Sequence, residues 1–99
     1  MKLMWNWGGK FFGYTHNEHL FTHRGKCVGR IHDEHIYGKA GEYLGEIMSE
    51  NRLITHKGKI NWRGPRAVNY RGGAIARYVA YVGYVMYVGH KDFPSWDTF

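Results

Sequence analysis

Three consecutive stretches of the chain share one pattern of glycines and apolar residues, with a period of about sixteen residues. They are residues 10–25, 26–41 and 42–58, and the third copy has one extra residue. A glycine stands at the fourth position of each copy and another closes it: Gly13, Gly29 and Gly45, then Gly25, Gly41 and Gly58. An internal repeat of this kind constrains the fold more than any other feature of the sequence.

Each copy is predicted to form one β-hairpin. Short apolar and β-branched runs are separated by the polar pairs Asn17-Glu18 and Asp33-Glu34, and by residues 49–51 in the third copy, which is typical of strand, turn, strand. The closing glycines predict left-handed turns between hairpins. The fourth-position glycines predict close backbone approach around a central axis, and the alternative is that they mark β-bulges.

A fourth copy is split between the two ends of the repeat region. Residues 59–64 match the first strand of a copy, with Trp62 in place of the glycine, and residues 3–9 match a second strand. Pairing them would close a ring and remove exposed strand edges. We therefore expect an all-β fold of about four hairpin repeats around a pseudo-four-fold axis. The N- and C-terminal strands of the repeat region pair to close it, and an extended C-terminal tail follows.

The glycine-centred pattern in residues 25–59, GKCVGRIHDEHIYGKAGEYLGEI…NRLI…KGK, resembles the four-fold β-flower family. These are small bacterial proteins named for four β-hairpin petals, and the resemblance covers residues 3–64. The ending at residues 92–95 is also similar to tails beside such domains. The resemblance implies the fold described above. Because the family is functionally uncharacterised, it implies no site residues, and Trp62 departs from its pattern.

After residue 64 the repeat pattern ends, so we expect a repeat domain at 1–64 and a basic linker with a Tyr/Val-rich tail at 65–99. Tyr-Val triplets fill residues 78–89 with a period of three, which matches neither a strand nor a helix, so no single apolar face is expected. Such a strand-prone segment must be covered. We expect it to pack on the repeat domain or across an interface between copies of the chain, anchored by Phe93, Trp96 and Phe99.

Positive charge is concentrated in one part of the chain. The net charge is +6, and residues 51–91 contain eight Lys/Arg and no acid. Cations neutralise phosphates and aromatic rings stack on bases, so the stretch 52–77 is a candidate nucleic-acid-binding segment. The alternatives are a solvated basic loop or pairing with an acidic protein partner. The candidate residues are Arg52, Lys57, Lys59, Trp62, Arg63, Arg66, Tyr70 and Arg71.

Histidines flank two of the predicted turns, as the pairs His16/His19 and His32/His35. Residues opposite each other in a hairpin have Cβ atoms about 4.5–5.5 Å apart, which lets two imidazoles share a divalent metal. The alternative is that these histidines are solvated, since the third copy has Met48 instead. No cofactor is predicted beyond adventitious divalent metal.

No catalytic constellation is apparent, because a nucleophile needs an adjacent base and Cys27 occupies a predicted strand position where it packs as an apolar residue. The longest apolar stretch, residues 74–89, contains Arg77 and is shorter than the roughly 20 residues of a membrane-spanning helix. The single cysteine and the lack of an apolar leader favour the cytoplasm.

These features predict a non-enzymatic interaction or structural module that self-associates through its Tyr/Val tail or binds a protein partner. Nucleic-acid binding through residues 52–77 is the first alternative. Metal binding by the histidine turns is the second.

Overall fold

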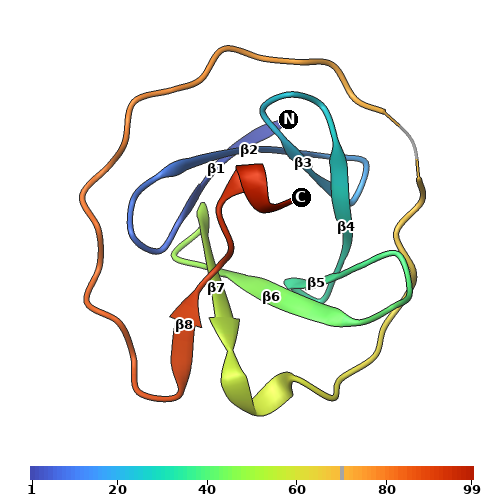
Figure 1. The fold of residues 1–99 in the computed structure, drawn as a ribbon, viewed down its shortest axis with the longest axis vertical. Helices are drawn as coiled ribbons and strands as arrows, with labels where there is room; N and C mark the ends of the chain where they lie inside the picture. Colours follow the sequence, from blue (N-terminus) through green and yellow to red (C-terminus); the bar gives the residue numbers. More distant parts are fainter. Residues whose placement is uncertain (70) are drawn as a thin grey trace.

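The computed structural model describes residues 1–69 and 71–99, and this part of the chain is all-β. Figure 1 shows a flattened molecule, with extents of 35 × 31 × 21 Å, in which the strands surround a centre crossed by the C-terminal segment. The described strands are β1 (Lys2–Asn6), β2 (Phe11–His16), β3 (His19–Thr22), β4 (Cys27–His32), β5 (His35–Tyr37), β6 (Tyr43–Met48), β7 (Arg52–His56) and β8 (His90–Asp92), with short 3-10 turns η1 (Lys57–Lys59) and η2 (Trp96–Thr98).

The first seven strands form a closed barrel of hairpins, which confirms the predicted fold class. Neighbouring strands pair antiparallel in chain order from β1 to β7. The ring closes where β1 pairs with β7, and this pair is parallel, with Trp5 opposite Arg52. The other half of the same β7 edge pairs with β8, where Ile54 lies opposite Asp92. One strand therefore holds both ends of the chain.

The predicted polar pairs form the hairpin turns. Both residues of each pair have positive φ: 48° and 61° at Asn17 and Glu18, and 50° and 65° at Asp33 and Glu34. In the third copy Ser49 and Glu50 adopt the same conformation, at 51° and 68°. Two consecutive residues with positive φ are the type I′ geometry, whose twist matches that of antiparallel strands. The repeat thus sets the register of all three hairpins.

The fourth-position glycines combine the two expected roles, because each lies beside a β-bulge and also close to a neighbouring backbone. Met4 pairs with Gly13 but Trp5 pairs with Phe11, which leaves Phe12 as the extra residue of the bulge. The same shift recurs at Gly29 and Gly45. A Cβ at Gly13 would collide with the β3 backbone. The bulge directs Phe12 into the core, where it is 1% exposed.

The core repeats with the sequence. The barrel strands contribute equivalent residues to this core. Phe93, which follows β8 and is 1% exposed, completes the core. Trp96 and Phe99 also pack against this core, as expected of residues predicted to anchor the tail. The buried cluster consists of Met4, Phe12, Leu20, Val28, Ile36, Leu53 and Phe93.

The fourth copy differs from the other three. Residues 59–64 form no strand, and only a single bridge joins Arg63 to Glu42. A tryptophan cannot make the close approach that glycine makes at this position, and Trp62 is instead 45% exposed. Gly58 lies within η1 and is not among the described glycines with positive φ, unlike Gly25 and Gly41. The place of the fourth hairpin is taken by β1 and β8.

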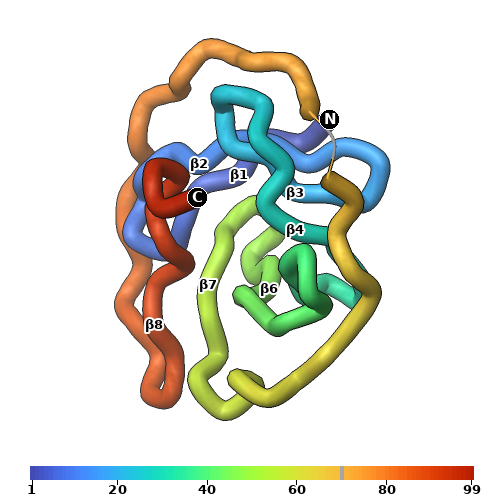
Figure 2. Tube along the Cα trace, turned by 45° about the vertical axis from the view of Figure 1, so that its right-hand side comes forward, coloured from blue at the N-terminus to red at the C-terminus, as the bar shows by residue number. Residues whose placement is uncertain are grey.

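Residues 64–89 are called the strap; of these, 64–69 and 71–89 are described, and they leave the barrel, circle it and lead into β8 (Figures 1 and 2). The boundary predicted at residue 64 does not separate two packing units, because β8 extends the sheet and Phe93 lies in the core. Within the described residues, no helix has the length and apolar character needed to cross a membrane.

Candidate functional site

The strap is attached to the barrel at three equivalent points. At each point a strap backbone N–H donates to the carbonyl of a glycine in a turn between hairpins, and the φ angles of these glycines are 79°, 89° and 92°. Only glycine adopts this conformation without strain. The pairs are Gly64 to Gly41 at 3.0 Å, Gly72 to Gly25 at 2.8 Å and Tyr81 to Gly9 at 2.8 Å.

An aromatic ring from each repeat lies under each attachment point. Tyr81 stacks on Trp5 with ring centroids 4.2 Å apart. At the other two points the strap residue is a glycine, and a Cβ there would lie 2.5 Å from the Tyr37 ring or 2.9 Å from the Phe21 ring. Sequence reasoning missed this aromatic series, although the regular spacing of Trp5, Phe21 and Tyr37 at sixteen residues was a sign of it.

The Tyr-Val triplets place tyrosines on the barrel and valines in solvent. Trp7 contacts Tyr84 and Tyr87, at centroid distances of 4.9 and 5.3 Å, and its Nε1 donates to the Val85 carbonyl at 3.0 Å. A period of three is that of an extended polyproline II chain, in which every third side chain points the same way. The segment therefore has two apolar sides, with tyrosines toward the barrel and valines toward solvent, an arrangement that neither the strand period nor the helix period describes.

Four valines line the outer side of the strap, and we call them the valine ridge. They are the most exposed large apolar side chains of the strap, while the tyrosines between them are about half exposed. The exposed fractions are 78% for Val79, 81% for Val82, 88% for Val85 and 100% for Val88.

Arg52, a predicted nucleic-acid ligand, lies under the strap. It is 3% exposed, and its guanidinium carbon lies 4.1 Å from the centroid of Tyr84 and 5.7 Å from that of Tyr81. Its Nη1 also donates to the Trp7 carbonyl at 3.3 Å. This cation–π arrangement holds the tyrosine side of the strap against β7. The side chain is not at the surface where a phosphate would meet it.

Lys59 and His35 belong to a partly buried polar network. The Lys59 ammonium donates to Glu46 Oε1 at 3.0 Å and to His35 Nε2 at 2.8 Å, and the Tyr43 hydroxyl donates to the same carboxylate at 2.7 Å. Burial alone would raise the pKa of Glu46, but the hydrogen bonds from Tyr43 and Lys59 outweigh burial and hold this pKa below its ordinary value. Burial and the bond to Glu46 raise the pKa of Tyr43.

Replacing Glu46 with glutamine is expected to lower the free energy of unfolding by about 2 kcal/mol at neutral pH, because charge-assisted hydrogen bonds are lost. Because folding lowers the pKa of Glu46, its carboxylate stabilises the folded state fully above pH 4.5, the ordinary pKa of the group. This stabilisation disappears as the pH falls through the pKa that Glu46 has in the folded protein. Urea unfolding of both proteins across this range should show the difference narrowing below pH 4.5. Glu50→Gln, at an exposed turn, is the control. If the difference in free energy of unfolding between the wild type and Glu46→Gln stays constant across this pH range, the prediction is contradicted.

The remaining predicted cations lie on the surface. Lys57 is exposed at η1. The other predicted surface cations are arginines that begin directly after Trp62 and continue into the first part of the strap. Tyr70 lies outside the described residues. These exposed arginines are Arg63, which immediately precedes the strap, and Arg66 and Arg71 within it.

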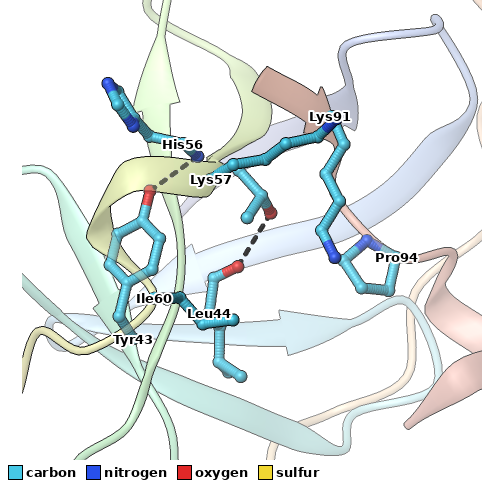
Figure 3. A pocket seen from close by; sticks show the side chains of 8 residues that line it. Tyr43, Leu44, His56, Lys57, Ile60, Lys91 and Pro94 are labelled. Carbon is cyan, nitrogen blue, oxygen red and sulfur yellow. Dashed lines mark hydrogen bonds between the residues drawn. The ribbon is translucent and has the colours of Figure 1, made fainter. Parts of the chain in front are cut away.

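A pocket of about 250 Å³ opens beside η1 (Figure 3). The Tyr43 hydroxyl, which also donates to Glu46, accepts the His56 N–H at 3.0 Å, so it is engaged as donor and acceptor. The Thr55 hydroxyl donates to the Leu44 carbonyl at 2.8 Å. The lining is otherwise mainly apolar with two lysines: Tyr43, Leu44, Thr55, His56, Lys57, Ile60, Lys91 and Pro94.

The histidine pairs lie opposite each other, His16 with His19 and His32 with His35. Both ring nitrogens of His19 have partners, since Nδ1 lies 2.8 Å from the Asn17 carbonyl and Nε2 accepts the Val68 N–H at 3.3 Å. His35 Nε2 accepts from Lys59. Within residues 1–69 and 71–99, no three His, Cys, Asp or Glu side chains converge as a metal would require. Metal binding by these turns stays a prediction.

No family model, curated protein or solved structure matches this chain. The resemblance to the four-fold β-flower family therefore stays a prediction.

Proposed function

We propose that this protein is a self-associating interaction module in which the valine ridges of two copies pack against each other. The observation that carries the proposal is the valine ridge itself, a valine at every third residue with its side chain 78–100% exposed. A concentration of large exposed apolar side chains in one segment of a small protein marks an interaction site. Fully burying one valine side chain contributes about 1.5 kcal/mol or more, so four from each copy are a substantial driving force.

The charge distribution favours a second copy as the partner. Each chain carries a net charge of +6, which opposes association wherever cations would meet. Residues 78–89 contain no charged side chain, so no like charges meet between the valines themselves.

The spacing of the valines is also self-complementary. In an antiparallel arrangement about a two-fold axis, Val79 of one copy would face Val88 of the other, and Val82 would face Val85. A two-fold interface requires this reciprocity, since each residue must find its partner on the same surface of the other copy. The attachment of the strap to the barrel reduces the ordering cost of association, because the segment is already fixed.

The experiment compares the solution mass of the wild type with that of the double variant Val82→Glu/Val85→Glu across a range of protein concentrations. The wild type is expected at twice the 11.6 kDa chain mass and the variant at the single chain mass, because the glutamates would face each other at the interface. Light scattering coupled to gel filtration measures both.

Val68→Glu is the matched control, since Val68 is a half-exposed strap valine outside the ridge. It should remain associated. A wild type of single-chain mass at high concentration, or equal dissociation by the control, would contradict the proposal.

A further inference from the structure

A second surface feature lies where the strap crosses the turns that end with Gly25 and Gly41. There Lys26 pairs through its backbone with Arg71, and Lys39 approaches from the following turn. These residues surround an open cavity of about 430 Å³. Its lining is Lys26, Cys27, Lys39, Asn69 and Arg71.

The charges around this cavity are uncompensated. In the part of the chain that the structure describes, the side chains of Lys26, Lys39 and Arg71 form no ion pair or hydrogen bond. The described part of the lining contains no carboxylate. Cys27 at the floor is 3% exposed, and burial raises the pKa of its thiol, so the floor is neutral. Three cations around one neutral-floored cavity form a site for an anion.

We propose that this cavity binds a phosphate group of a single-stranded nucleic acid. Lysine ammonium groups and the arginine fork donate to phosphate oxygens, and the Asn69 amide adds a neutral donor. This inference goes beyond self-association and does not rest on it, because the valine ridge belongs to the strap section attached at Gly9.

The surroundings of the cavity favour a polymer over an isolated anion. A smaller cavity of about 210 Å³ shares Lys26, Cys27 and Lys39 with the first and reaches Glu42, whose backbone pairs with Arg63. The Glu42 carboxylate accepts the Ala40 N–H at 3.0 Å, within its own turn.

Two further exposed cations are Arg63, whose backbone pairs with Glu42, and Arg66 three residues later. Trp62 precedes Arg63, and its ring contacts Lys59 Nζ at 4.7 Å and His35 at 5.2 Å. The side chain is 45% exposed, and this exposed part of the ring is available for base stacking. Cations along a backbone path with an exposed aromatic ring are what single-strand binding requires.

The test is the fluorescence anisotropy of a labelled single-stranded oligothymidylate with the full chain at several salt concentrations. One phosphate in the cavity and one each at Arg63 and Arg66 make three phosphate contacts, which predict a slope of log affinity against log salt of about −2, or roughly 20-fold weaker binding after a fourfold rise in salt. Lys26→Gln/Lys39→Gln should weaken binding about tenfold at low salt and reduce the slope by about 0.7, because the cavity holds one of the three phosphates.

The matched control is Lys2→Gln/Lys10→Gln. Lys10 holds the position of Lys26 in the preceding repeat, so the control removes the same charge from a comparable turn without touching the cavity. It should leave the affinity within about twofold of wild type, since only nonspecific attraction changes. Equal weakening by the two double variants, absence of binding at low salt, or equally tight binding of an acidic peptide would each overturn the proposal.

Discussion

Replacing Gly13 with alanine is expected to lower the free energy of unfolding by about 4 kcal/mol or more, among the largest effects of a single methyl group. The new Cβ would collide with the Phe21 carbonyl oxygen and lie 2.6 Å from the carbonyl carbon of Thr22. Both are backbone atoms of β3, which pairs on one side with β2 and on the other with β4. Because β3 is held from both sides, it cannot move away. Urea unfolding followed by tryptophan fluorescence measures the loss.

Two other glycines provide a graded comparison. At Gly29 the nearest atom is Ile36 Cγ2 at 2.7 Å, a side-chain methyl group that can give way, and the backbone overlap is limited to the Tyr37 carbonyl oxygen at 2.8 Å, so alanine should cost less there. At Gly73 nothing lies within 4 Å, and alanine should change stability by less than about 1 kcal/mol. If Gly13→Ala is no more destabilising than Gly73→Ala, the close backbone approach is not a structural requirement. A Gly13→Ala chain that does not fold, beside a folded Gly29→Ala, would agree with the prediction.

Replacing Phe93 with alanine is expected to lower the free energy of unfolding by about 3–5 kcal/mol, the usual range for deleting a buried phenylalanine. Phe93 is 1% exposed, and its ring packs edge-on against Phe12 at 5.4 Å and stacks with Phe99 at 5.8 Å. A Cβ at Gly45 would come within 2.5 Å of the same ring, so β6 closes tightly around it. For a domain of this size, each kcal/mol should lower the melting temperature by roughly 4–8 °C.

The control for this prediction is Phe99→Ala, which removes a partly buried phenylalanine from the edge of the same cluster. Its cost should be clearly smaller, because less of the ring leaves solvent on folding. Equal costs for Phe93→Ala and Phe99→Ala would show that the segment after β8 lies on the barrel without completing its core.

The hairpins were predictable because the repeat contains the determinants of local structure. The pairs Asn17-Glu18 and Asp33-Glu34 specify two-residue turns, and glycine at the fourth position specifies where the backbone bulges and approaches its neighbour. Residues 59–64 broke the pattern at Trp62, and the predicted strand failed at that point. The parallel β1–β7 closure follows from that failure, since β1 then meets the third hairpin directly.

The path of the strap was not predictable by the same means. A period of three identifies a packed side only when the barrel surface beneath it is known, and that surface depends on rings sixteen residues apart in other strands. Nor could the sequence show which of the basic side chains are buried. Arg52 and Lys59 share the acid-free stretch with Arg71, yet the first packs under tyrosines and the second pairs with Glu46. The cavity, in contrast, depends on Lys26 and Lys39, which lie outside that stretch.

The strap meets the repeats in the reverse of the order in which a ribosome makes them. Its contacts run from Gly41 to Gly25 to Gly9, so the repeat synthesised first is covered last. Two hydrogen bonds join the start of the chain to residues made much later. Trp5 Nε1 donates to the Val79 carbonyl, 74 positions away, and the Trp7 N–H donates to Asp92, 85 positions away.

Phe93 is the thirty-seventh residue after His56, where β7 ends, so translation at 5–20 residues per second takes roughly 2–7 s to reach it. During that interval the nascent chain lacks both the residue that completes its core and the cover for its aromatic rings. The core of this barrel is therefore completed only after the strap has been made.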